Sequence, residues 1–193
     1  MSRTRLFVLQ VLGLLTLAAA FAWAPEARAD DYGDVNGLRR SGQFADALAR
    51  ADQYLATRPG DPQMRFLKGV IQTEAGRADD AIATFVALNQ DYPELPEPYN
   101  NLAVLYAGRS EFDKARVALE MATRANPGYA VAHENLGDVY AKLAGISYAK
   151  ARQLDANSAS VQPKLALIQQ LLSPSGQTGT VVPAAGPKAA PGS

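Results

Sequence analysis

Residues 99–127 read YNNLAVLYAGRSEFDKARVALEMATRANP, and the key positions of this stretch recur along the chain at intervals of 34 residues. Counting outward in that step gives a column of alanines, one of prolines, one of small residues and one of apolar residues. The members are Ala47, Ala81, Ala115 and Ala149; Pro59, Pro93 and Pro127; Gly42, Gly76, Ser110 and Ala144; and Phe44, Ala78, Phe112 and Ile146. Four columns in register indicate a structural repeat, because a fixed period of 20–50 residues is typical of stacked units.

Each unit contains the spacing of two amphipathic helices. The spacing i, i+3 and i+4 occurs in the first helix at Leu102, Leu105 and Tyr106. It occurs again in the second helix at Ala115, Ala118 and Leu119. The proline that follows each second helix cannot continue it. Helices this short are marginal alone, so the units must stack. The sequence predicts an all-α chain without strands, with helices near 31–41, 44–57, 62–75, 78–91, 96–108, 112–125, 130–143, 146–155 and 159–172.

The repeat resembles the tetratricopeptide repeat, whose pattern is W-x2-L-G-x2-Y, then A-x3-F, then P. The matching residues are Tyr99, Leu102, Ala103, Tyr106, Ala115, Leu119 and Pro127 in the third unit, His133, Leu136, Gly137 and Tyr140 in the fourth, and Gly69, Ala81, Phe85 and Pro93 in the second. The resemblance covers roughly residues 30–160. It implies a right-handed superhelical solenoid of antiparallel helix pairs, with about four units and a C-terminal capping helix, and it says little about activity.

The units are expected near 30–61, 62–95, 96–129 and 130–157, with the capping helix at 159–172. Two of them depart from the pattern. The first has Gly33 and Gly37 in its first helix, so it is expected to fray or to act as an atypical cap. The fourth ends early, which predicts a shortened hairpin near Ala144 and Gly145 followed by a short second helix.

The two ends of the chain differ from the repeats. Residues 1–29 have the order of a secretory signal peptide: two arginines, an apolar run from Leu6 to Trp23, and an A-x-A site that ends at Ala29. Cleavage after Ala29 predicts a periplasmic protein, and the absence of Cys from the chain suits that oxidising compartment. The alternative is an uncleaved inner-membrane anchor, because the run is near the ~20 residues that span a bilayer. Residues 173–193 hold four Pro and four Gly, which predicts a disordered tail.

The composition limits the chemistry that the chain can perform. The 19 Lys and Arg balance 19 Asp and Glu, so there is no basic field to attract nucleic acid. One His and no Cys leave no zinc set, and no motif of a hydrolase, a nucleotide-binding loop or a dinucleotide-binding fold is present. The expectation is a protein that is not an enzyme and has no catalytic residue, metal or cofactor. His133 is expected to be a packing residue.

The resemblance places partner binding on the first helix of each pair, which lines the concave groove at repeat positions two, five, nine and twelve. Those positions carry Gln63, Phe66, Val70 and Thr73; Glu97, Asn100, Val104 and Ala107; and Val131, Glu134, Asp138 and Ala141, with Tyr32, Asn36 and Arg39 in the first unit. Chaperone-binding relatives hold a carboxylate with a Lys/Asn/Arg clamp, and the lysines of that clamp are missing here. Asn100 is expected to face the groove, whereas Asn135 either contacts a peptide or supports helix packing.

Three functions follow as hypotheses. The leading one is a non-catalytic periplasmic scaffold that binds an extended segment or a helix of a protein partner, in envelope assembly, division or secretion, with no contact to the membrane after cleavage. The second is an assembly factor anchored in the inner membrane by its first segment. The third, a remote one, is an enzyme on a helical repeat scaffold. The partner and the oligomeric state stay open.

Overall fold

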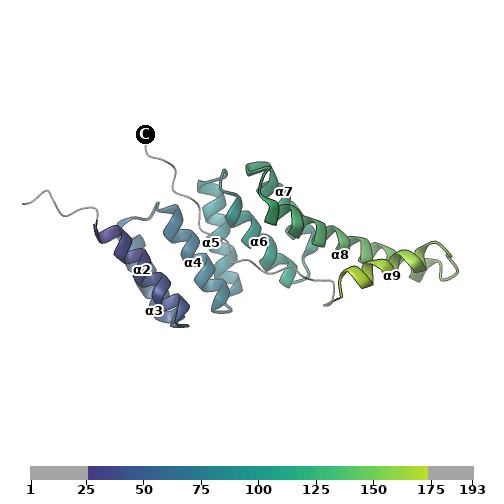
Figure 1. Cartoon of the computed structure of the whole chain (residues 1–193), viewed down its shortest axis with the longest axis horizontal. Coiled ribbons are helices and arrows are strands. Elements are labelled where there is room, and N and C mark those ends of the chain that lie inside the picture. The colour runs from purple at the N-terminus through teal and green to yellow at the C-terminus, as the bar shows by residue number, and fades with distance from the viewer. Residues whose placement is uncertain (1–25, 174–193) are drawn as a thin grey trace, which may run out of the picture. The chain divides into compact units, whose positions relative to one another are not determined.

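The computed structural model describes residues 26–173, and side chains from residue 31 onward; every regular element in this range is an α-helix (Figure 1). The helices are α2 (Glu26–Arg40), α3 (Phe44–Thr57), α4 (Pro62–Glu74), α5 (Ala78–Asp91), α6 (Pro96–Gly108), α7 (Phe112–Ala125), α8 (Ala130–Leu154) and α9 (Val161–Leu171). The prediction of an all-α fold is confirmed. The expected disordered tail lies outside the described residues, apart from Ser173, and so does the expected signal peptide, apart from its last four residues in α2.

The described helices form two compact units that divide within α3, between Arg50 and Ala51. They differ from the 34-residue repeats, and we call them the first unit and the second unit. In the first unit the Arg50 guanidinium joins α3 to α2, since it lies 2.8 Å from the carboxylate of Asp31 and 3.3 Å from that of Asp34. Gly33 and Gly37, which were expected to loosen the first helix, lie inside α2.

Three tight turns with one geometry connect α2 to α3, α4 to α5 and α6 to α7. Gly42, Gly76 and Ser110 stand at the turn and adopt positive φ angles of 74°, 73° and 60°. In each turn the following residue donates its backbone N–H to a carbonyl five residues earlier, as Glu111 does to Tyr106. A left-handed residue at this place ends a helix and satisfies its last carbonyls. The small residues that recur every 34 positions, Gly42, Gly76 and Ser110, therefore mark the ends of α2, α4 and α6.

The fourth member of that column is Ala144, and there the predicted hairpin is wrong. The expected helices 130–143 and 146–155 are one continuous helix, α8. Alanine has the highest helix propensity, and its Cβ disfavours positive φ. The signal that ends the other three first helices is therefore missing, and the helix runs on for about three more turns.

Two apolar clusters hold the second unit together, and α6 contributes to both. Phe66, Ala81, Phe85, Leu88 and Leu102 form the first, with Phe66 and Phe85 rings 5.8 Å apart. The second consists of Ala103, Ala115, Ala118, Leu119, Ala122, Ala132 and Val139. Leu102 and Ala103, adjacent on α6, thus face different neighbours, which is how α6 connects two successive repeats.

Small residues matter unequally along the stack. A Cβ on Gly69 would lie 2.6 Å from the Phe85 ring, so the glycine is required for the approach of α4 and α5. Gly137 holds the same repeat position, and by its place in the sequence pattern it would be expected to play the same part, but a Cβ there would meet nothing within 4 Å. The expectation is wrong because α8 has no second helix opposite that point.

Helix α9 packs against the outer part of α8. Leu165 is buried between them, and Gly145 lies against Ile168. The outer side of α9 is not polar, because Leu167 and Leu171 remain exposed. None of the helices in the described range is both long enough and apolar enough to cross a bilayer.

Candidate partner-binding surface

In the second unit α6 contacts both α4 and α8, so these three helices are neighbours on one side of the stack. We refer to α4, α6 and residues 130–141 of α8 as the first-helix surface. Local signals position its helices. The Asp61 carboxylate accepts the backbone N–H groups of Gln63 and Met64 at the start of α4, and proline stands in the first turn of α4 and of α6.

The predicted groove residues differ in their accessibility. The exposed ones are Gln63, Thr73, Glu134 and Asp138; the half-buried ones are Val70, Glu97, Val104, Ala107 and Val131, together with Tyr32, Asn36 and Arg39 in the first unit; and the buried ones are Phe66, Asn100 and Ala141. Phe66 is a core residue whose ring packs at a tilt against Phe85, and it cannot receive a ligand side chain without rearrangement.

Asn100 is buried, with 3% of its surface exposed, so the expectation that it faces an open groove is wrong. The Nδ2 of Asn135 on α8 donates a hydrogen bond of 2.8 Å to the Oδ1 of Asn100 on α6. A buried amide needs a partner, and each of these two residues supplies one to the other. The helix-packing role for Asn135 therefore agrees with the structure, and Asn100 shares it.

Sequence reasoning missed Asn101, although the repeat contained the signal. Asn101 stands 34 residues before Asn135, but the residue 34 before Asn100 is Phe66. The phenyl ring has no acceptor to offer, and the Nδ2 of Asn101 is buried without a hydrogen-bond partner among the described residues. Among the described first helices of the second unit, the amide link is thus made once, between α6 and α8.

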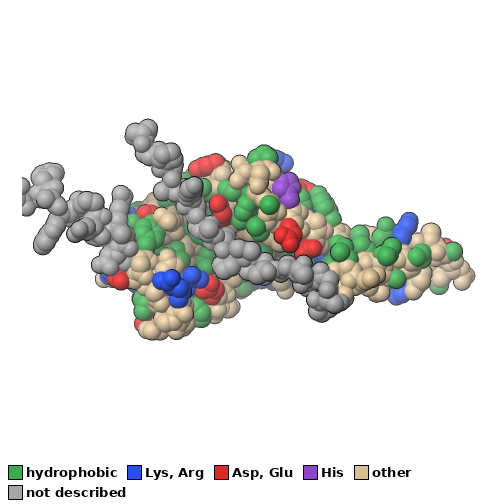
Figure 2. Space-filling view, in the orientation of Figure 1, with side chains coloured by type: hydrophobic (Ala, Val, Ile, Leu, Met, Phe, Trp, Pro, Cys, Tyr) green, Lys and Arg blue, Asp and Glu red, His purple; other side chains and the backbone are tan. Residues whose placement is uncertain are grey.

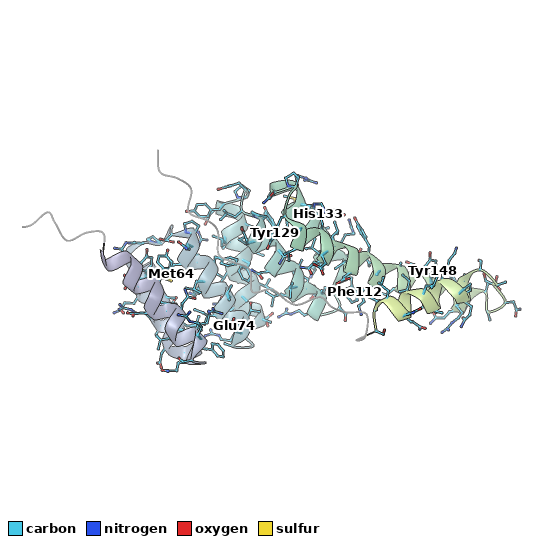
Figure 3. All side chains as sticks on the ribbon, in the orientation of Figure 1. Met64, Glu74, Phe112, Tyr129, His133 and Tyr148 are labelled. Carbon is cyan, nitrogen blue, oxygen red and sulfur yellow. The ribbon has the colours of Figure 1, made fainter. Side chains whose placement is uncertain are left out.

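Glu97 and Tyr129 form a polar corner of the first-helix surface. The Oε2 of Glu97 is buried and accepts no hydrogen bond from the described residues. Burial, and secondarily the negative charge of Glu97, raise the pKa of the Tyr129 phenol. Tyr129 lies before α8, next to His133 in Figure 3. It belongs to no 34-residue column, so the sequence carried no signal for it.

The acidic residues of this surface contrast with the charges of α7. On α7 the Arg116 guanidinium lies 2.7 Å from Glu120, and this hydrogen bond lowers the pKa of the Glu120 carboxyl. Glu97, Glu134 and Asp138 form no ion pair within the described range. Figure 2 shows acidic side chains gathered near His133. The first-helix surface therefore offers unpaired negative charge beside apolar Val104 and Val131.

His133 is exposed, and its Nε2 lies 2.9 Å from the carbonyl oxygen of Pro127. The expectation of a packing histidine is therefore wrong, because the ring bonds to a backbone carbonyl at the surface. No cluster of three or more His, Cys, Asp or Glu within residues 31–173 could hold a metal ion.

A separate apolar pocket of about 410 Å³ lies between α6 and α7. Tyr99, Leu102 and Tyr106 line it from α6, and Val117 and Met121 from α7. The same residues of α6 carry the repeat pattern, so this pocket lies away from the predicted groove positions.

Comparison with known proteins agrees with this architecture. The family model described as tetratricopeptide repeat matches residues 32–96. The structure of MamA has a TM-score of 0.54 and 21% identity, covering 70% of this chain and 82% of that one. Residues 32–96 are thus tetratricopeptide repeat sequence, and the described stack has the tetratricopeptide repeat fold.

Further tetratricopeptide repeat proteins are similar to this chain. A thermophilic one from Thermus thermophilus has a TM-score of 0.53 and 23% identity, covering 74% of this chain and 81% of that one. The chloroplastic tetratricopeptide repeat domain-containing protein PYG7 of Arabidopsis thaliana is 34% identical over 79 residues, which are 38% of this chain. The match spans only about a quarter, 26%, of the PYG7 chain. In all of them the likeness is one of repeat and fold.

Proposed function

We propose that this protein is a non-catalytic scaffold of the periplasm that binds a segment of a protein partner on its first-helix surface. The fold is typical of protein interaction scaffolds, which use the extended concave surface of the stack. Tetratricopeptide repeat proteins are also generally non-catalytic. Envelope assembly, division and secretion are the processes that we propose for it.

The observation that carries the proposal is the row of accessible side chains on α4, α6 and α8. Thr73, Val104 and Asp138 lie on three neighbouring first helices, and each is exposed or half-exposed. An apolar stretch followed by carboxylates suits a helix or an extended segment that has apolar residues and a Lys or Arg. The hydrogen bond between the buried Asn100 and the half-buried Asn135 keeps α6 and α8 in register beneath it.

Site-specific photocrosslinking tests this proposal. A benzophenone amino acid at Thr73 or at Asp138 should crosslink the native partner in exported protein, and mass spectrometry would identify it. The control is the same group at Val117, which is 51% exposed but lies on α7. Adducts from Thr73 and Asp138 that are absent from Val117 would support the first-helix surface. Adducts from Val117 alone would move binding to the α6–α7 pocket.

The periplasmic part of the proposal rests on the A-x-A site at Ala29, and the anchored assembly factor is its alternative. N-terminal sequencing of the protein recovered from cells distinguishes the two. A chain that begins at Asp30 in the soluble periplasmic fraction supports the scaffold in its free form. A chain that keeps residues 1–29 and sediments with membranes supports the anchored form.

A further inference from the structure

The charges of the second unit are segregated along the stack. Residues 51–138 contain eight Lys and Arg against thirteen Asp and Glu, whereas residues 139–173 contain four Lys and Arg against one Asp. The second range is the outer part of α8 together with α9. We call it the basic hairpin. In Figure 2 it is the narrow end of the second unit, with Lys and Arg side chains standing singly among apolar ones.

Among the described residues, the basic side chains of this hairpin have no carboxylate partner. Within residues 31–173 none of Lys142, Lys150, Arg152 and Lys164 forms an ion pair. The single acidic residue, Asp155, instead accepts the backbone N–H of Asn157. Unpaired positive charge on the hairpin thus matches the unpaired negative charge of Glu97, Glu134 and Asp138 on the first-helix surface.

Apolar residues accompany the charges on both helices of the hairpin. Ile146, Lys150 and Leu154 follow one another at i, i+4 and i+8 on α8, and both apolar side chains are exposed, Leu154 to 77%. On α9, Lys164 precedes the exposed Leu167 and Leu171 at i+3 and i+7. Such spacing is that of a helix that lays an apolar face into a groove.

These two surfaces cannot meet within one chain. Asp138 and Lys150 belong to the same continuous helix, and twelve residues of helix separate them by about 18 Å. A rigid helix cannot fold back on itself, so the hairpin can reach a first-helix surface only on another copy of the chain.

We propose that the basic hairpin of one copy docks on the acidic first-helix surface of a second copy. This inference rests on the proposed function, because it assigns a second copy of the chain as one occupant of the same surface. The interface is head-to-tail, since a different patch is used on each partner. Such contacts close into a ring or continue as an open chain of copies.

A flat anionic lipid surface is less suited to the hairpin than a second copy. Gly145 faces α9 at Ile168, and the Ile146–Lys150–Leu154 stripe lies on the other side of α8. Leu167 likewise lies opposite the buried Leu165 on α9. A membrane would cover one of the two stripes and leave the other in water.

The test uses exported protein with the N-terminus that cells leave on it. Sedimentation velocity from about 1 to 100 μM, which brackets micromolar affinity, should show mass that grows with concentration and falls with added salt. Lys150→Glu/Arg152→Glu and Glu134→Lys/Asp138→Lys should each be monomeric over the same range. The control is Arg58→Glu/Arg124→Glu, which changes the net charge as much at two exposed positions outside the hairpin and should assemble like the wild type.

The decisive sample is an equimolar mixture of the two reversed variants. One has an intact first-helix surface and the other an intact hairpin, so the two variants should associate with each other although each is monomeric alone. Unchanged circular dichroism shows that each variant is folded. A mixture that stays monomeric overturns the proposal, and so does a wild type that is monomeric at every concentration.

Two further measurements separate the possible failures. If the wild type is monomeric but Thr73 and Asp138 still crosslink a different protein, self-association is wrong and the scaffold function stands. If the monomeric wild type instead binds vesicles of phosphatidylglycerol and phosphatidylcholine, and Lys150→Glu/Arg152→Glu abolishes that binding, the hairpin is a lipid-binding element and the proposal is likewise overturned.

Discussion

Replacement of Gly69 by alanine tests how closely α4 and α5 approach. The added Cβ would lie 2.6 and 2.7 Å from two carbons of the Phe85 ring. Phe85 is fully buried and cannot swing into solvent. Overpacking of this kind costs about 1–3 kcal/mol, whereas alanine in place of glycine within a helix contributes about 1 kcal/mol in the other direction. The net expectation is a protein less stable than the wild type by up to about 2 kcal/mol.

Gly137→Ala is the matched control. Gly137 occupies the same repeat position 68 residues later, inside α8, and its added Cβ meets nothing within 4 Å. The helix-propensity gain then acts alone, so this variant should be more stable by up to about 1 kcal/mol. The two variants should therefore differ by roughly 1–3 kcal/mol, the overpacking term itself.

Urea unfolding followed by circular dichroism measures both free energies of unfolding, provided that the slope with denaturant does not change. Equal stability of Gly69→Ala and Gly137→Ala would refute the reasoning, because the Phe85 contact would then cost nothing. A Gly69→Ala protein more stable than the wild type would refute it equally.

The third 34-residue repeat, residues 96–129, suggests a change at Phe85 that would compensate for Gly69→Ala. There the residues equivalent to Gly69 and Phe85 are Ala103 and Leu119, so a larger first-helix residue accompanies a smaller second-helix one. Gly69→Ala/Phe85→Leu should therefore be more stable than the sum of the two single changes predicts. A coupling free energy of about 0.5–3 kcal/mol is typical of residues in contact. Additive effects would show that the two positions do not compete for the same space.

The remaining predictions concern other places in the second unit. Ala115→Phe should lower the melting temperature, since Ala115 is fully buried and overpacking costs about 1–3 kcal/mol or more. Asn100→Ala should reduce the free energy of unfolding by about 1–3 kcal/mol, because it leaves the Asn135 amide unpaired. Burial and the charge of Glu97 raise the pKa of the Tyr129 phenol, so the folded state favours the neutral phenol. The stability that this preference contributes is present below pH ~10 and is lost as pH rises through the raised pKa. Glu97→Gln should lower the pKa of Tyr129 in an NMR titration. Deletion of residues 174–193 should leave the melting temperature measured by calorimetry nearly unchanged, because a segment so rich in Pro and Gly has too few large apolar residues to form a core.

Local signals in the sequence were enough to place most of the helices. The expected ranges 44–57, 78–91, 96–108 and 112–125 agree with α3, α5, α6 and α7. These boundaries depend on neighbouring residues only: proline in a first turn, and a glycine or serine that accepts positive φ. The same physics explains the error at Ala144. The four residues of its column share a small side chain, but the helix ends at Gly42, Gly76 and Ser110 depend on the left-handed conformation, which alanine disfavours.

The tertiary structure decided what each side chain can reach. Asn100 and Phe66 hold the same repeat position, yet one bonds to Asn135 on the next first helix and the other packs on Phe85. Whether the buried Oε2 of Glu97 has a hydrogen-bond donor likewise depends on which residues surround it in space. Periodicity determines which face of a helix points inward, because that follows from 3.6 residues per turn. Burial and pairing depend on residues that lie far apart in the sequence, 19 positions for Phe66 and Phe85 and 35 for Asn100 and Asn135, and on whether α8 ends or continues.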